Sequence, residues 1–291
     1  MSAIIKIFHN KEVTAMKKTI DFLKKQPLLT AIIAVVFAIF GIKLLSSDNN
    51  FGLGIHRFML AFAMFPFLYI ISGEKTFQKS EKTTGYVFKT LFGLLVFAIF
   101  LCSFGVIYSI VEKFALADDC VIATLMLLFA MLGVGLFEEM TFRAVVNDGF
   151  IYQFRDKKWV FAVSAILGSL LFGYVHVMTD TVTNLLTLAQ VVLKTVSTGM
   201  FGMCLLFLYW KTRNIWGCAI VHGVYDFLLS VNDTVFVNPE KQEISYVNEG
   251  VMGGTAVGIY IVEIVVVGII MIILYHKVLK TIDFEELRKN W

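Results

Sequence analysis

The sequence predicts an all-α, polytopic membrane protein with about eight transmembrane helices. Apolar residues make up 58% of the 291 residues and charged residues only 16%, against roughly 45–50% and about 25% in ordinary globular domains. The mean hydropathy is +0.79, and three prolines in the whole chain leave the apolar segments almost free of helix breakers. We therefore expect the lipid bilayer to surround this chain, and we expect no nucleic-acid partner.

Eight apolar stretches are long enough to be candidate spans, since crossing a bilayer takes about 20 mostly apolar residues. Together they define an expected transmembrane domain over residues 27–276. The candidate spans are residues 27–45, 52–72, 86–110, 120–143, 159–178, 185–209, 214–231 and 251–275.

Lys and Arg alternate between the connections of these spans. Six lie in the N-terminal arm, eight in the second, fourth and sixth loops, and four in the tail, whereas the other loops carry only Lys113 and Lys241. Cytoplasmic loops are enriched in Lys and Arg. The pattern predicts a multi-pass protein of the cell membrane with both termini in the cytoplasm and a cytoplasmic tail at residues 277–291.

The first 26 residues form a separate basic segment. Val13, Met16, Ile20 and Leu23 recur at helical spacing among lysines. This pattern is typical of an amphipathic helix lying on the inner membrane surface, although a solvated charged tail is an equal alternative.

Three ionisable residues stand together in the fourth candidate span. Each would cost roughly 2.5–3.5 kcal/mol on insertion, which makes such residues functional candidates. Glu139 and Arg143 are one helical turn apart and can pair, whereas Glu138 points about 100° away around the helix. The simplest division is one working glutamate, Glu138, and one structural pair.

Two histidines lie in other apolar spans. His176 is in the fifth and His222 in the seventh, with Asp226 one turn further on. A single buried histidine is usually a core residue, but two of them with a Glu-Glu pair on a third helix favour function. Further polar residues in apolar spans, which could line a water-filled cavity, are Gln190, Lys194 and Glu263.

These groups suit hydrolysis by an activated water. Glu138 can act as general base, and an imidazole can donate a hydrogen bond to an oxyanion. No Ser or Cys has an obvious base partner, and the four cysteines form no C-x-x-C pair. We expect no cofactor, but zinc held by Glu138, His176 and His222 is an alternative, disfavoured because H-E-x-x-H is absent.

The three motifs resemble those of the CPBP family, the CAAX proteases and bacteriocin-processing enzymes formerly called Abi. That family carries E-E-x-x-x-R, F-x-x-x-H and H-x-x-x-N on separate helices. The matching residues lie in an expected catalytic core over about 119–230, and they are Glu138, Glu139, Arg143, Phe172, His176 and His222.

The resemblance implies an intramembrane glutamic-type endopeptidase acting on membrane-tethered or membrane-partitioned peptides. Glu138 would be the base, His176 would help hold the water, and His222 would contribute to the oxyanion pocket. Glu139, Arg143 and Phe172 would support the site. Asp226 stands where asparagine is commonest, and we expect it to orient His222.

Two other classes of function are open. The chain could be a non-catalytic member of the same family, such as a bacteriocin self-immunity factor or a scaffold for a membrane signalling protein. A proton-coupled transporter would also place Glu and His in the membrane, but no inverted repeat is evident. Whether a substrate would be prenylated is not decided by these residues.

The depth of the site requires the fourth helix to be longer than its hydropathy indicates. A helix ending at Arg143 would put Glu138 near the cytoplasmic end and His176 near the far end of its own span. The apolar run at 150–154 suggests that the helix continues to about residue 154. We then expect Glu138 and His176 to share one water.

Overall fold

A computed structural model of the chain describes residues 2–45, 47–237 and 245–291. The architecture is almost entirely helical, apart from two short strands. In chain order the elements are α1 (Ser2–Lys24), α2 (Pro27–Leu44), α3 (Asn50–Ala63), α4 (Phe65–Ser72), η1 (Gly73–Phe77), α5 (Thr84–Thr90), α6 (Phe92–Val111), β1 (Ala115–Leu116), α7 (Cys120–Glu138), η2 (Glu139–Val146), α8 (Asn147–Phe154), α9 (Val160–Val175), α10 (Leu185–Thr212), α11 (Ile215–Ser230), α12 (Asn232–Val235), β2 (Phe236–Val237), α13 (Gly250–Lys277), η3 (Leu279–Thr281) and α14 (Phe284–Asn290).

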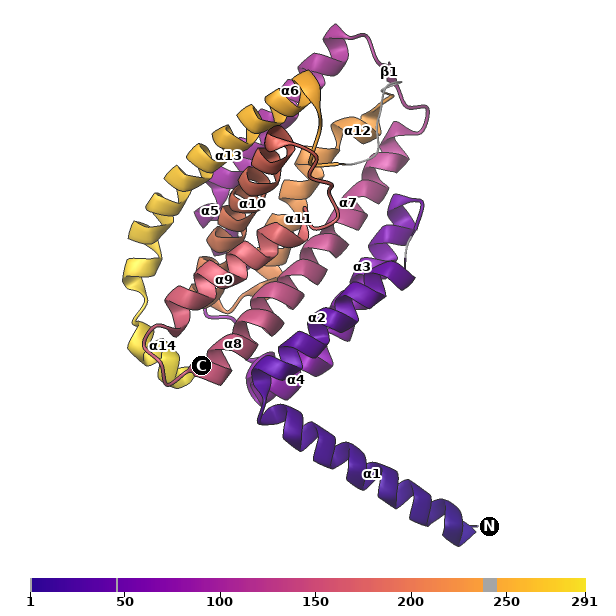
Figure 1. The fold of residues 1–291 in the computed structure, drawn as a ribbon, viewed down its shortest axis with the longest axis vertical. Coiled ribbons are helices and arrows are strands. Elements are labelled where there is room, and N and C mark those ends of the chain that lie inside the picture. The colour runs from indigo at the N-terminus through magenta and orange to yellow at the C-terminus, as the bar shows by residue number, and fades with distance from the viewer. Residues whose placement is uncertain (1, 46, 238–244) are drawn as a thin grey trace.

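The helices form an elongated bundle, and their lengths bear on the predicted number of spans (Figure 1). Within the described residues, six helical stretches are long and apolar enough to cross a membrane. The other two predicted spans correspond to α9 and α11, which have 16 residues each. Sixteen residues rise about 24 Å, less than the bilayer's hydrocarbon thickness of about 30 Å.

The fourth helix has the predicted extension. Residues Cys120–Phe154 form one stretch of 35 residues, so the expectation that it reaches about residue 154 is confirmed. The sequence did not reveal that η2, its middle section, is a π-helix. Such wide turns are rare and occur frequently at functional sites.

Different helices and connections lie at the two ends of the bundle. The ends of α4 and α8 and the C-terminal helix α14 lie together at the end from which α1 projects (Figure 1). The antiparallel pair β1–β2 and helix α12 lie at the opposite end. All the Lys- and Arg-rich connections predicted to be cytoplasmic therefore gather at the α1 end, which we call the basic end.

The C-terminal segment packs against the bundle. The Trp291 side chain is buried and its ring lies near those of Phe161 and Tyr209. Lys75 Nζ donates to the carbonyl oxygens of Asn290 and Trp291, at 2.6 and 2.8 Å. The predicted tail at 277–291 is thus a docked helical element.

Small residues let the central helices approach closely, as is common between membrane helices. A Cβ at Gly135 of α7 would lie 2.5 Å from the carbonyl oxygen of Ala219 in α11. A Cβ at Gly223 of α11 would lie 2.6 Å from that of Met131 in α7. This close crossing brings the end of α7 against the middle of α11, where the candidate site lies.

Candidate active site

The polar residues singled out in the sequence converge at one place. Glu138 ends α7, His176 follows the last residue of α9, and His222 lies in the middle of α11. The Oε2 atom of Glu138 is 3.7 Å from Nε2 of His176 and 3.7 Å from Nε2 of His222. Three helices distant in sequence therefore present one carboxylate and two imidazoles to each other.

His222 is held by a residue of the neighbouring helix. Its Nδ1 lies 2.8 Å from Oε1 of Glu139, and because a carboxylate only accepts hydrogen bonds, Nδ1 is the donor. Nη1 of Arg143 is 3.2 Å from the same Glu139 oxygen. The predicted Glu139–Arg143 pair is thus present, and it also positions His222, which the sequence did not reveal.

His176 is held in the same way, but by its own helix. Its Nδ1 lies 2.8 Å from the carbonyl oxygen of Phe172, and this carbonyl can only accept. Both imidazoles therefore use Nδ1 for support and turn Nε2 toward Glu138. A hydrogen bond at the far ring nitrogen is the usual way in which proteins fix the orientation of a functional histidine.

Phe172 helps to hold both imidazoles, because its carbonyl binds His176 and its ring packs against Arg143, the partner of Glu139. The Arg143 guanidinium carbon lies 4.0 Å from the centroid of the Phe172 ring, which is cation–π geometry. A Cβ at Gly202 of α10 would come within 2.7 Å of both Arg143 Nη2 and the Phe172 ring. A glycine at this position therefore leaves room for the stacked pair.

Asp226 occupies the cavity side of His222. Its Oδ2 is 3.4 Å from Nε2 of His222, the nitrogen opposite the one held by Glu139. The side chain is 27% exposed, compared with 19% for Glu138. Asp226 therefore shares the Nε2 side of the ring with Glu138, and the hydrogen bond that fixes the ring comes from Glu139.

A cavity of about 680 Å³ opens above these groups. Besides Glu138, His176, His222 and Asp226, its lining includes Arg57, Lys194, Tyr246 and Glu263. Lys194 Nζ lies 4.7 Å from the centroid of the Tyr246 ring. Burial raises the pKa of Tyr246 to about 12, so its hydroxyl stays protonated and can donate. The cavity thus provides a volume lined by polar side chains beside the carboxylate.

Of the other intramembrane polar residues predicted to line a cavity, Lys194 and Glu263 do so and Gln190 does not. The Gln190 side chain bonds both the backbone N–H and the carbonyl of Asn248, at 2.8 Å each. Arg57 was missed, because its position near the end of a candidate span is ordinary for a basic side chain. Tyr246 was missed because it lies in a loop before α13.

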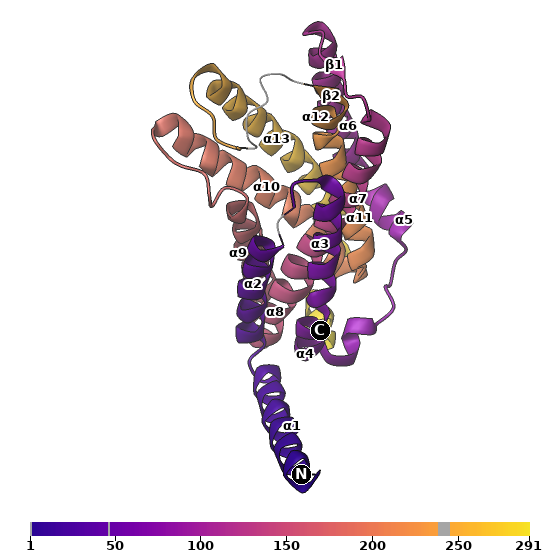
Figure 2. The same ribbon diagram turned by 90° about the vertical axis from the view of Figure 1, so that its right-hand side faces the viewer.

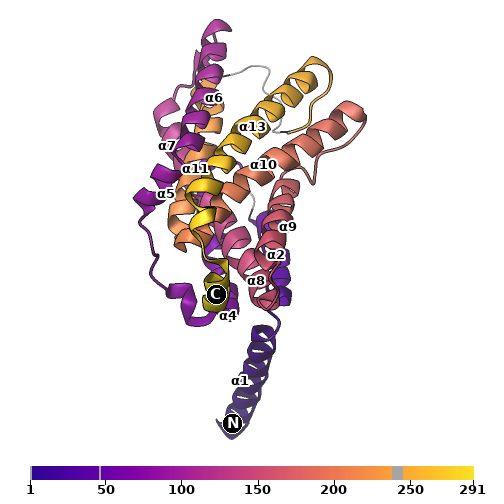
Figure 3. The same ribbon diagram turned by 90° about the vertical axis from the view of Figure 1, so that its left-hand side faces the viewer.

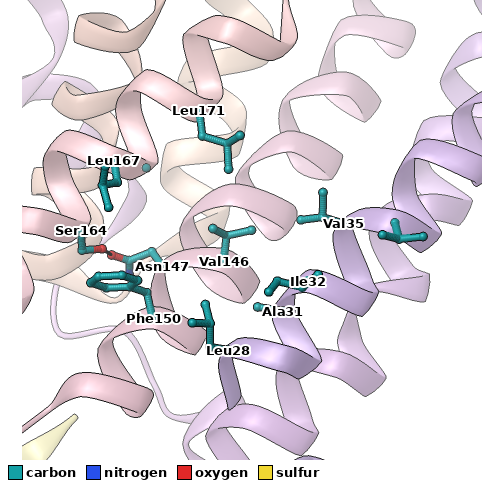
Figure 4. A pocket seen from close by; sticks show the side chains of 12 residues that line it. Leu28, Ala31, Ile32, Val35, Val146, Asn147, Phe150, Ser164, Leu167 and Leu171 are labelled. Atoms are coloured by element: carbon teal, nitrogen blue, oxygen red, sulfur yellow. Dashed lines mark hydrogen bonds between the residues drawn. The ribbon is translucent and has the colours of Figure 1, made fainter. Parts of the chain in front are cut away.

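A second hollow of about 260 Å³ lies between α2, α8 and α9 (Figure 4). Its lining is apolar except for Asn147 and Ser164. The Ser164 hydroxyl donates to the Asn147 side-chain oxygen at 2.8 Å, so these polar groups are already paired. This hollow lacks the groups that hydrolysis requires.

Among residues in the described ranges, no group of three His, Cys, Asp or Glu side chains could hold a metal ion. Cys204 and Cys218 are free and buried, and Cys218 Sγ points at the carbonyl of Leu205. Cys218 lies one helical turn before His222 on α11, but its thiol donates to that carbonyl and is not hydrogen-bonded to an imidazole base, as an activated nucleophile would be.

Comparison with known protein families identifies this region independently. Residues 121–228 match the family model described as Type II CAAX prenyl endopeptidase Rce1-like. Searches of curated proteins and of solved structures gave no match. The matched stretch contains all of Glu138, Glu139, Arg143, Phe172, His176, His222 and Asp226. The three motifs that meet in one cavity of this multi-pass membrane protein therefore lie in a segment that is similar to the CAAX protease family.

Proposed function

We propose that this protein is an intramembrane endopeptidase that hydrolyses peptide bonds of membrane-tethered or membrane-partitioned substrates. One observation carries the proposal. Oε2 of Glu138 has no hydrogen-bond partner among the described residues, yet it faces two imidazole nitrogens and a 680 Å³ cavity. A buried oxygen left without a partner has capacity for water and substrate.

Water activation follows from this geometry. A water in the cavity beside Glu138 gives its proton to that carboxylate and attacks the peptide carbonyl carbon. His176, whose Nδ1 proton is engaged by the Phe172 carbonyl, offers the Nε2 lone pair to hold the same water. Glu138 then returns the proton to the departing amine nitrogen, which balances the step.

The developing oxyanion needs a hydrogen-bond donor. His222 supplies it from Nε2 when that nitrogen carries a proton, while Nδ1 remains bonded to Glu139. Asp226, 3.4 Å from this Nε2, stabilises the protonated ring. Glu139 and Arg143 keep the imidazole fixed during the reaction.

We propose that no metal takes part, because the carboxylate and two imidazoles provide both the base and the donor. Zinc, if used, would be held by Glu138, His176 and His222 and would lower the pKa of a bound water. Dialysis of the purified protein against a chelator distinguishes the two schemes. Full activity should persist, and a loss restored by Zn²⁺ would contradict the metal-free scheme.

The decisive test is Glu138→Gln, which keeps the shape of the side chain and removes the base. General base catalysis contributes about 10²–10⁴-fold, so cleavage of a membrane-reconstituted peptide substrate should fall by that factor. Glu112→Gln makes the same chemical change at an exposed carboxylate outside the site and should cleave normally. Undiminished turnover in Glu138→Gln would overturn the proposal and favour the non-catalytic role of a self-immunity factor or scaffold.

A further inference from the structure

We infer that substrates reach the site from the extracytoplasmic face of the membrane, through the end of the bundle opposite the basic end. This inference rests on the proposed function and adds the side from which peptide segments are taken. Three independent observations support it: the direction of the cavity, the closed packing below the site, and the distribution of charge between the ends.

The cavity runs in one direction from Glu138. On α3 it is lined by Asn50, Leu53 and Arg57, from the first half of that helix. On α11 it is lined from His222 upward to Ser230, and beyond that by Thr234 of α12. These elements lead toward the β1–β2 end. Figures 2 and 3 show α10 and α13 diverging from α7 toward that same end.

The path from Glu138 toward the basic end is closed. Directly below the site, Met140 and Val145 have no exposed surface. Further down, Asp148 is fully buried and binds Arg213 and Tyr209. The docked Trp291 ring covers this network, with the Arg213 guanidinium carbon 4.2 Å from its centroid.

The two ends of the bundle differ in charge, as the cytoplasmic and extracytoplasmic ends of a membrane protein do. The basic end carries the Lys- and Arg-rich connections, which are retained on the cytoplasmic side. The connections at the open end carry exposed carboxylates instead, namely Asp48, Glu112, Asp118, Asp119 and Glu249. Lys113 is the only Lys or Arg in these connections within the described ranges. The open end therefore faces away from the cytoplasm.

The substrate chemistry follows from this orientation. A cleavable segment emerges from the membrane on the extracytoplasmic side, at the end of the bundle that carries these exposed carboxylates. Neutral or basic segments are favoured there over acidic ones, because like charges repel.

Sided cysteine labelling tests the inference on the full-length protein. In a background with Cys102, Cys120, Cys204 and Cys218 replaced by Ala, Thr234→Cys and Thr198→Cys report on the cavity wall. Lys157→Cys, in an exposed loop at the basic end, is the matched control. Each is treated with a membrane-impermeant cationic methanethiosulfonate in intact cells and in inverted membrane vesicles.

The two cavity variants should lose their free thiol in intact cells and keep it in inverted vesicles, with Lys157→Cys showing the reverse. Labelling of the cavity variants from the same side as Lys157→Cys overturns the inference, as does absence of labelling from either side. Repeating the assay with Glu138→Gln separates this inference from the proposed function. Labelling does not depend on catalysis, so a failed cleavage assay leaves the pattern unchanged.

Discussion

Two buried carboxylate clusters lie on the same helical stretch, Cys120–Phe154, and they are built in opposite ways. Asp148, in α8, is fully buried and every partner is in place. Arg213 donates to both of its oxygens at 3.3 and 3.0 Å, and the Tyr209 hydroxyl lies 3.1 Å from Oδ2. Asn147 and Ser72 add weaker contacts at 3.2 and 3.3 Å.

The Glu138–Glu139 cluster, which precedes Asp148 by nine to ten residues and lies nearer the other end, is incompletely paired. Oε2 of Glu138, Oε2 of Glu139 and Nη2 of Arg143 lack hydrogen-bond partners in the described part of the chain. Nη1 of Arg143 is ion-paired with Glu139 Oε1 at 3.2 Å but makes no hydrogen bond there. A satisfied buried network makes a fold rigid and specific, whereas buried groups left unpaired require an explanation such as catalysis or bound water. The difference separates a structural network from the candidate active site on the same helical stretch.

The largest effect that we expect is a loss of stability when Asp148 is replaced, which tests the structural half of this comparison. Asp148→Ala leaves the mostly buried Arg213 without its partner, and removing one member of a buried ion pair costs about 3–5 kcal/mol. The midpoint of thermal unfolding in detergent should fall sharply. Asp156→Ala, which removes an exposed aspartate from the loop after α8, should change it little. Equal stability of the two variants would contradict the structural assignment of the Asp148 network.

The sequence predicted the residues that face the cavity better than it predicted the contacts that hold those residues in place. Intramembrane charge identified Glu138, His176 and His222, because such residues are expensive wherever they occur. The extension of the fourth helix to Phe154 followed from an apolar run and from the need to bring Glu138 to the depth of His176. These two predictions, of the charged intramembrane residues and of the longer helix, depend only on composition and on the rise per residue.

What could not be predicted depends on the rotation of helices about their own axes. The π-helix at Glu139–Val146 changes the angular relation between Glu139 and the residues after it, and no residue type marks it. The Glu139–His222 hydrogen bond depends on that rotation. Arg213 was counted as an ordinary basic loop residue, since only the folded chain brings it to Asp148. The count of eight spans stays a prediction, because α9 and α11 are apolar helices of only 16 residues each.

A smaller effect, on turnover rather than stability, is expected at Glu139. Residues that orient a functional histidine typically change activity by about 10–100-fold when removed. Glu139→Ala should therefore lower kcat by that factor with KM nearly unchanged, because the substrate touches the cavity and not Glu139. Glu139→Gln keeps an oxygen that accepts from His222 Nδ1 and should recover much of the loss. If Ala and Gln variants are equally active, this hydrogen bond does not position His222.

The smallest effect is expected at Phe172, where the two supports of the site meet. Phe172→Leu keeps an apolar side chain and the backbone carbonyl that holds His176, but it removes the ring beneath Arg143. Cation–π contacts are worth about 0.5–2 kcal/mol, with the larger values in desolvated surroundings, and this ring is 1% exposed. The unfolding midpoint should drop slightly and kcat/KM should fall several-fold, whereas Phe92→Leu, at a ring 62% exposed on the outer surface of α6, should change neither. A Phe172→Leu enzyme with unaltered kinetics would show that the Glu139 salt bridge alone holds Arg143. The incompletely paired cluster would then depend on fewer contacts than its geometry indicates.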